Sequence, residues 1–272
     1  MVVTCAILAA QATAQQGLYF RPQIAKKWAH NVNAPVGFRT DQGYVIKVEP
    51  NNKLKPVGIF FGLGIGYRRG LWFAEMGICE DVAEYQVSIN ATRWTSLNGE
   101  AYSNVEQFRT GELFSRSSVT IGRRILGPRA SVKASKGYVE VMGMLSVELW
   151  HRSHGSTVGL YHQEWNASPT DSLSWTMHTE VARYSAISLA PCVMFKAFNK
   201  KGHSMLNVSL SYSHILGERT LVRATNCFVN YADGLSYTTT INGGGGGLYL
   251  ALSKDIYLNN IFSRRHESSI IE

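Results

Sequence analysis

Four histidines lie close together in a segment of the sequence that is also rich in tryptophan. They are His151, His154, His162 and His178, and Glu164 lies among them. Imidazole and carboxylate groups are ligands of zinc and copper, so a metal site is one interpretation of this segment. The spacing matches no closed zinc site, however, and solvated loop histidines are the simpler interpretation. We therefore predict no metal and no cofactor.

Two serine–histidine neighbours raise the question of a hydrolase nucleophile and its base: Ser153 with His154, and Ser213 with His214. A membrane lipase or acyltransferase needs a serine hydroxyl beside a histidine. Adjacent residues on a strand point to opposite faces, so Ser213 and His214 do not pair directly. The G-x-S-x-G motif of a nucleophile elbow is absent from the sequence. We expect the protein not to be an enzyme, and an outer-membrane lipid enzyme is the least favoured alternative.

A run of five glycines at residues 243–247 invites comparison with a phosphate-binding loop. Such a loop continues into a lysine, a serine or threonine and the start of a helix, and none of these follows here. Glycines in a strand allow a sheet to bend sharply, and this is the role that we predict for the run.

The chain is basic, with 27 Lys and Arg against 19 Asp and Glu, a formal net charge of +8. The basic residues do not form a stripe interleaved with aromatics, so we predict no nucleic-acid partner. Many of them lie where turns are expected: Arg68, Arg69, Arg123, Arg124, Arg129, Lys133, Lys136, Lys200 and Lys201. Such a basic rim attracts anionic lipid head groups or an acidic partner, and plain solvation is the equal alternative.

Alternation at period two dominates the chain, and helical periodicity is hard to find. At residues 57–67, large apolar side chains alternate mostly with glycine. Similar alternation occurs at 138–149, 187–196 and 206–213, and less regularly at 17–28, 71–79, 113–123 and 237–253. The regular segments have about the 9–11 residues with which a tilted strand crosses a bilayer. We predict eight strands, with ten as the alternative count.

Short and long connections alternate along the chain. The short ones lie near residues 68–70 and 199–202, and the basic segment 124–136 is of medium length. The long ones cover residues 29–56, 80–112, 151–180 and 215–236.

Outer-membrane barrels have short turns at one rim and long loops at the other. Lipid also requires a closed sheet, because every backbone group must be paired. These features predict an all-β fold: a closed antiparallel transmembrane β-barrel with short periplasmic turns and long extracellular loops. A soluble lipocalin-like barrel fits the two faces poorly.

The beginning of the chain has the features of an export signal. A short apolar run at residues 2–10 precedes the small-x-small sequence at residues 12–14, which is typical of a cleavage site. We predict a signal peptide at residues 1–14 and a single barrel domain at residues 15–272. Three cysteines then remain, Cys79, Cys192 and Cys227, and we expect free thiols.

Three segments carry a recognisable pattern: GLYFRPQI at 17–24, GIFFGLGIGYRRGLWFAEMGI at 58–78 and GGGGGLYLALS at 243–253. They resemble the PorT-like outer-membrane β-barrels of Bacteroidetes-type bacteria, which are broadly OmpA-like eight-stranded barrels. The resemblance covers nearly the whole mature chain as a pattern and brings no catalytic motif. It implies a location in the bacterial outer membrane. The chain departs from the family by continuing past residue 253 to Phe262, which leaves the end of the last strand open.

Charged residues occupy strand positions that would face the lumen: Arg21, Lys27, Glu75, Glu140, Glu148 and Lys196. An unpaired buried charge is costly, and side chains fill the interior of an eight-stranded barrel. We therefore predict that Arg21, Glu75, Glu140 and Glu148 form ion pairs that close the lumen, with Arg21 reaching a glutamate across it.

The function that follows is a small, monomeric outer-membrane barrel with a structural or interaction role. Its expected partners are outer-membrane lipid and other envelope proteins. A narrow channel or a ligand-binding barrel is the alternative.

Overall fold

Eight strands form a closed antiparallel barrel in the computed structural model, which describes residues 17–29, 36–39, 44–50, 55–94, 101–127, 137–152, 160–168, 171–200, 202–231, 234 and 236–258. In spatial order they are β1 (Gly17–Ala29), β4 (Lys55–Arg69), β5 (Trp72–Trp94), β6 (Ala101–Leu126), β7 (Tyr138–Arg152), β10 (Ser185–Phe198), β11 (Ser204–Ile215) and β14 (Gly247–Ser253). The sheet closes because β14 pairs with both β11 and β1. The predicted fold class and the eight-strand count are confirmed.

The chain continues past β14 into β15 (Ile256–Tyr257), which also pairs with β1. β14 and β15 therefore pair with the same strand, β1, and the last barrel strand extends past residue 253. Phe262 and the predicted signal peptide lie outside the described residues. Among those residues, no helix has the length and apolarity needed to cross a membrane.

The outer wall of the barrel is a belt of exposed apolar side chains, as the alternation predicts. Leu145 is 51% exposed, whereas its neighbour Ser146 is 7% exposed. On β4 the side chains of Ile59, Phe61 and Leu63 are likewise exposed. An apolar outer band of this kind is what a barrel presents to lipid.

The inner face of β4 is a stripe of glycines that leaves room for side chains from the neighbouring strands. A Cβ atom on Gly64 would lie 2.8 Å from the Oε1 atom of Glu75. A Cβ atom on Gly66 would collide with the ring of Tyr19 and lie 2.8 Å from the carbonyl oxygen of Ala74. The glycines are therefore required by the packing of the lumen.

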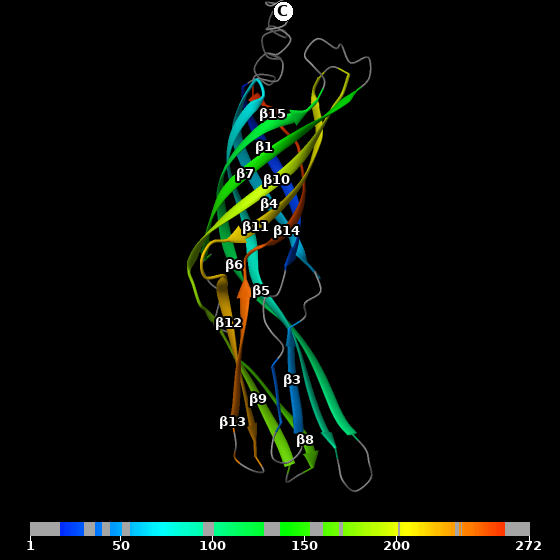
Figure 1. Ribbon diagram of the computed structural model, residues 1–272, viewed down its shortest axis with the longest axis vertical. Coiled ribbons are helices and arrows are strands. Elements are labelled where there is room, and N and C mark those ends of the chain that lie inside the picture. The colour runs from blue at the N-terminus through cyan, green and yellow to red at the C-terminus, as the bar shows by residue number, and fades with distance from the viewer. Residues whose placement is uncertain are drawn as a thin grey trace, which may run out of the picture.

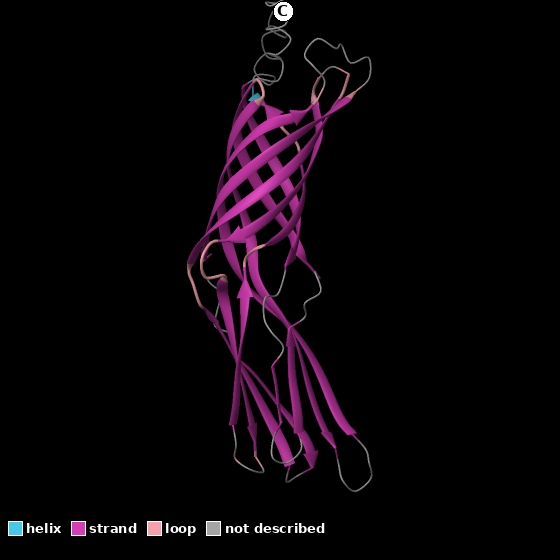
Figure 2. Cartoon of the chain, in the orientation of Figure 1, coloured by secondary structure: helices cyan, strands magenta, loops and turns pink. Residues whose placement is uncertain are grey.

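The segments predicted as long extracellular loops are largely strands, so that part of the prediction is wrong. Beyond the barrel, the chain forms an extension visible in the lower half of Figures 1 and 2. Its further strands are β2 (Val36–Arg39), β3 (Tyr44–Pro50), β8 (Leu160–Ser168), β9 (Asp171–Val181), β12 (Thr220–Asn230) and β13 (Ser236–Gly244). β2 and β3 add to the long β5–β6 hairpin, while β8, β9, β12 and β13 form a second antiparallel group.

The segment predicted as one strand at residues 237–253 is two strands. β13 belongs to the extension, β14 belongs to the barrel, and residues 245–246 connect them. A Cβ atom on Gly245 would lie 2.7 Å from Leu221 and 2.9 Å from Trp150. The glycine run thus allows the chain to pass closely over the barrel mouth, which is more specific than the bending that we predicted.

The extension encloses an apolar core that continues into the barrel mouth. Phe114 and Trp150 come from barrel strands, and Trp175, Phe228 and Ile46 come from the extension. All five side chains are fully buried, and Trp175 stacks with Phe228 at 6.2 Å between ring centroids. These contacts explain why the segments fold as strands, since burying their apolar faces against each other is favourable.

We predict that Gly66→Ala lowers the free energy of unfolding by roughly 1–3 kcal/mol, because the methyl group overpacks the lumen. The displaced Tyr19 ring would also lose its 2.9 Å hydrogen bond to Glu75. Urea unfolding of the protein in detergent micelles, followed by tryptophan fluorescence, measures the change.

Gly58→Ala is the control on the same strand, where the nearest contact of a Cβ atom is an ordinary 3.4 Å to Phe60. Equal unfolding midpoints for the two variants would contradict the packing argument.

Candidate functional site

The lumen contains an extended set of buried ion pairs, which is the candidate site. In the described residues it brings together six cations and five carboxylates: Arg21, Lys27, Arg68, Arg116, Arg124 and Lys196 with Glu75, Asp81, Glu140, Glu148 and Asp255. Each has at least one partner of opposite charge, as low-polarity surroundings require. The pairs fall into three groups along the barrel axis.

The first group lies near the short turns. The Nη2 atom of Arg68, on β4, lies 2.8 Å from Oε2 of Glu140 on β7. The Nη1 atom of Arg124, on β6, lies 2.9 Å from the other oxygen of Glu140. Glu140 and Arg68 are buried, whereas Arg124 is partly exposed. One carboxylate therefore holds two guanidinium groups at this end of the lumen.

The second group is centred on Asp255, between β14 and β15. Its two carboxylate oxygens accept hydrogen bonds from Arg21 Nε at 2.7 Å and from Lys196 Nζ at 2.6 Å. Asn207 donates to the same carboxylate at 2.9 Å. Arg21 also pairs with Glu75 at 2.8 Å, passing over the glycine stripe of β4. This group joins β1, β5, β10 and β11 to the segment between β14 and β15.

The third group lies toward the extension. Lys27 Nζ is 2.8 Å from Asp81 Oδ1, and the hydroxyl of Tyr249 donates to the other oxygen of Asp81 at 2.8 Å. Arg116 lies 3.2 Å from Glu148 and 3.6 Å from Asp81, so it links the two carboxylates.

Neutral groups complete this third cluster. The hydroxyls of Ser188 and Ser213 donate to Glu148 at 2.7 and 2.6 Å. The indole of Trp150 donates to Ser188 at 2.9 Å, and the Lys27 ammonium lies 5.0 Å from the centroid of the Trp150 ring. Trp150 thus joins the charged lumen to the apolar core of the extension.

A cavity of about 70 Å³ remains between the second and third groups. Its lining includes Arg21, Glu75, Arg116 and Glu148. One water molecule needs roughly 10–15 Å³ of cavity volume, so this cavity has room for a few waters. Solutes larger than a few atoms do not fit in it.

The four site residues predicted from the sequence all face the lumen, but they do not all pair with one another. Arg21 pairs with Glu75, and not with Glu140. Glu140 pairs with Arg68 and Arg124, and Glu148 pairs with Arg116.

The prediction that placed Arg68 in the basic rim is wrong, because its side chain is 2% exposed and points inward. Of the other rim residues, Arg69, Arg123 and Lys200 are exposed.

Four lumen residues were missed by the sequence reasoning: Arg68, Asp81, Arg116 and Asp255. Arg68, Asp81 and Asp255 lie past the predicted end of a strand, and Arg116 lies on a strand whose alternation is weak. Asp255, for example, continues the buried series of Tyr249, Ala251 and Ser253. Extending the period-two count past the last apolar residue would have found it.

The histidine segment and the serine–histidine neighbours form no catalytic arrangement among the described residues. His162 lies 3.5 Å from Glu164 on the exposed face of β8, and the described residues hold no group of three metal-ligating side chains. The Ser213 hydroxyl is buried against Glu148, while His214 contacts Arg219. His154 lies outside the described residues, and Cys79, Cys192 and Cys227 are free cysteines.

Comparison with known proteins leaves the family open. No family model and no curated protein matches the chain. Among solved structures, it shows a similarity to the outer-membrane expressed OmpT of Vibrio cholerae, with 7% sequence identity and a TM-score of 0.13 over 88% of this chain and 97% of that chain. A TM-score of this size carries no argument, and the resemblance to PorT-like barrels stays a prediction.

We predict that Asp255→Asn lowers the free energy of unfolding by about 3–5 kcal/mol, because it leaves the Lys196 ammonium buried without its carboxylate. Arg21 would keep Glu75 as a partner. Urea unfolding in micelles measures the loss.

Lys254→Gln, at the adjacent exposed position, is the control and should unfold like the wild type. Adding Lys196→Met to Asp255→Asn removes the unpaired charge and should restore much of the stability. If Asp255→Asn and Lys254→Gln unfold at the same urea concentration, the network does not stabilise the barrel.

Proposed function

We propose that this protein is a bacterial outer-membrane β-barrel with a non-conducting lumen and a structural or interaction role. The observation that carries the proposal is the set of paired charges that crosses the lumen in three groups. The closed sheet and its apolar outer belt support the membrane location, since lipid accepts only a sheet without edges.

A closed lumen is supported at both ends of the barrel. Arg68, Glu140 and Arg124 occupy the end near the short turns. At the other end, Trp150 and Phe114 pack in the apolar core of the extension. An ion entering from either side would have to separate buried ion pairs or pass through packed apolar side chains, and both are costly.

The orientation follows from the two unlike rims. β4 joins β5 through Gly70 and Leu71, and β10 joins β11 through residues 199–203. In bacterial barrels the short turns face the periplasm, so the extension would project from the cell surface.

An interaction role is supported by the edges of the extension. Among the described strands, β8 pairs only with β9, and β2 pairs only with β3. An edge strand presents unpaired backbone groups to which a strand from another protein can add. We propose an envelope or surface protein as the partner, docking on a monomeric barrel of the PorT-like type.

The alternative function, a narrow channel or ligand-binding barrel, is favoured by one observation, the polar cavity in the lumen. Its 70 Å³ would have to be connected to both rims for conduction. A lipid enzyme is the weakest alternative, because the Ser213 hydroxyl is engaged by Glu148 inside the barrel.

We predict that the wild-type protein gives no steady current in a planar bilayer. Glu140→Gln removes the carboxylate shared by Arg68 and Arg124 and should produce a leak or an earlier urea midpoint. Glu180→Gln is the matched control, since Glu180 forms a half-exposed pair with Arg223 on the extension. Steady, ion-selective current through the wild type would defeat the closed-lumen proposal and favour the channel.

We predict that the extension is accessible from outside the cell and that the short turns are not. Thr240→Cys, exposed on β13, should react with a membrane-impermeant maleimide on intact cells. Lys200→Cys, exposed at a short turn, should react only after the envelope is permeabilised. Both variants are made with Cys227→Ser, because Cys227 is the half-buried native thiol. The reverse labelling pattern would invert the proposed orientation.

A further inference from the structure

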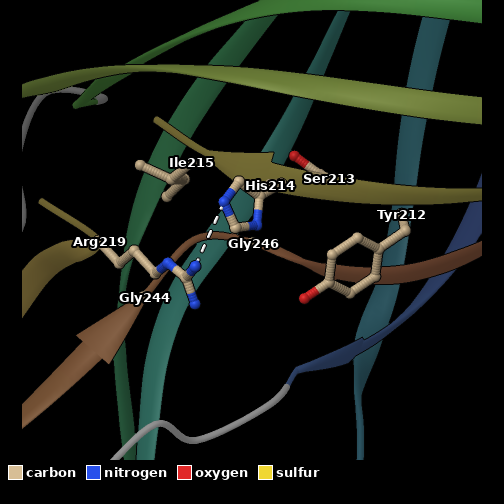
Figure 3. Close-up of a pocket in the computed structure, with 7 residues that line it drawn as sticks. All are labelled: Tyr212, Ser213, His214, Ile215, Arg219, Gly244 and Gly246. Atoms are coloured by element: carbon tan, nitrogen blue, oxygen red, sulfur yellow. Dashed lines mark hydrogen bonds between the residues drawn. The ribbon is translucent and has the colours of Figure 1, made fainter. Parts of the chain in front are cut away.

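The outward face of β11 changes from apolar to polar at His214. Val208, Leu210 and Tyr212 precede it on the same face and form part of the apolar belt. The rings of Tyr212 and His214 are neighbours, with centroids 6.4 Å apart (Figure 3). This is the level at which an outer-wall side chain leaves the hydrocarbon and meets lipid head groups.

A turn brings an arginine back to this level. Gly217 has a φ of +75°, a left-handed conformation that glycine adopts readily, and it reverses the chain between β11 and β12. Arg219 consequently lies against His214, and its Nη2 atom is 3.3 Å from His214 Nε2 (Figure 3). Gly244 and Gly246 also line this place and contribute only backbone.

The result is a small cationic pocket of about 40 Å³ at the rim of the barrel. Within the described part of the chain, Arg219 forms no ion pair, and its side chain contacts the imidazole of His214. A second guanidinium, of Arg183, donates to the carbonyl oxygen of Glu218 at 2.6 Å on the same turn. The exposed carboxylate of Glu218 pairs with neither arginine in the residues described.

A shallow, open groove lies beside this pocket on the outer wall of the barrel. It has a volume of about 310 Å³ and is lined largely by apolar and small residues, including Gly143, Pro191, Val193 and Leu210. Tyr212 lines both, so the apolar groove and the cationic pocket are neighbours on either side of its side chain. Gly143 contributes only backbone to this wall, and the end of the Ile125 side chain lies beside it.

We propose that the two cavities together form a binding site for a phosphate-bearing membrane lipid. The acyl chain lies in the groove, and the phosphate lies against Arg219 and His214. The Arg219 guanidinium keeps most of its N–H donors free, and their planar arrangement matches the oxygens of a phosphate. The groove offers apolar contacts to an acyl chain, which a lipid has and a free anion does not. The inference rests on the proposed membrane location and is independent of whether the lumen conducts.

The test uses the full barrel in mixed micelles with phosphatidylglycerol and phosphatidylcholine of identical acyl chains. Native mass spectrometry counts the lipids that remain bound after release from detergent. The wild type should retain phosphatidylglycerol over phosphatidylcholine, and Arg219→Gln should weaken that preference by roughly tenfold, the effect of losing one charge-assisted contact. Arg223→Gln, whose arginine pairs with Glu180 outside both cavities, should keep the preference.

The groove is tested separately with Gly143→Leu. A Cβ atom there meets only the flexible end of Ile125, at 2.7 Å, so the barrel should still fold. The variant should retain less of both lipids with an unchanged ratio, whereas Val139→Leu, exposed on the same face outside the groove, should behave as the wild type. The urea midpoint of each variant verifies folding.

Two outcomes would overturn the proposal. One is equal retention of phosphatidylglycerol by the wild type and by Arg219→Gln. The other is displacement of the lipid by millimolar inorganic phosphate, which would make this a site for a free anion. Heat-modifiable gel mobility and membrane fractionation of the same protein report the membrane location by themselves, so its failure is distinguishable from failure of the lipid site.

Discussion

Every charge inside an eight-stranded barrel must find its partner across a lumen only a few side chains wide. This constraint explains much of the interior. Arg21 reaches Glu75 because the intervening strand presents glycine instead of a side chain. Asp255 binds two cations that come from different strands, so the closure of the sheet and the pairing of the charges depend on each other. Removing one member of such a set is costly because its partner is left as an uncompensated buried charge.

Period-two alternation predicts the barrel strands well, because a strand that faces lipid on one side must be apolar at every second residue. It also assigns the lumen positions of Arg21, Glu75, Glu140 and Glu148 correctly to the inner face. It does not predict the pairing. Which carboxylate Arg21 meets depends on the stagger between β1 and β5, and the stagger is a property of the closed sheet and not of any one strand.

The extension was missed for a different physical reason. The sequence between the barrel strands lacks the long uniform alternation of the barrel wall, since side chains of β9 and β12 pack in the core of the extension. Trp175 and Phe228 lie in segments that were predicted as long loops, yet they stack with each other inside a protein core. Aromatic residues in a loop-length segment are compatible with both environments, and only the partner strand distinguishes them.

The hairpin of β5 and β6 runs without interruption from the barrel wall into the extension. At roughly 3.3 Å per residue, residues 82–94 span about 40 Å beyond the last charged group of β5 in the lumen. The described end of the hairpin, at Trp94 and Ala101, is thus held on a continuous ladder of backbone hydrogen bonds instead of a tether. A protein that docks there meets a surface whose conformational entropy is already lost on folding, so binding would need little further ordering of this chain. The distance from the lipid surface at which such a complex forms would then be set by the length of a strand.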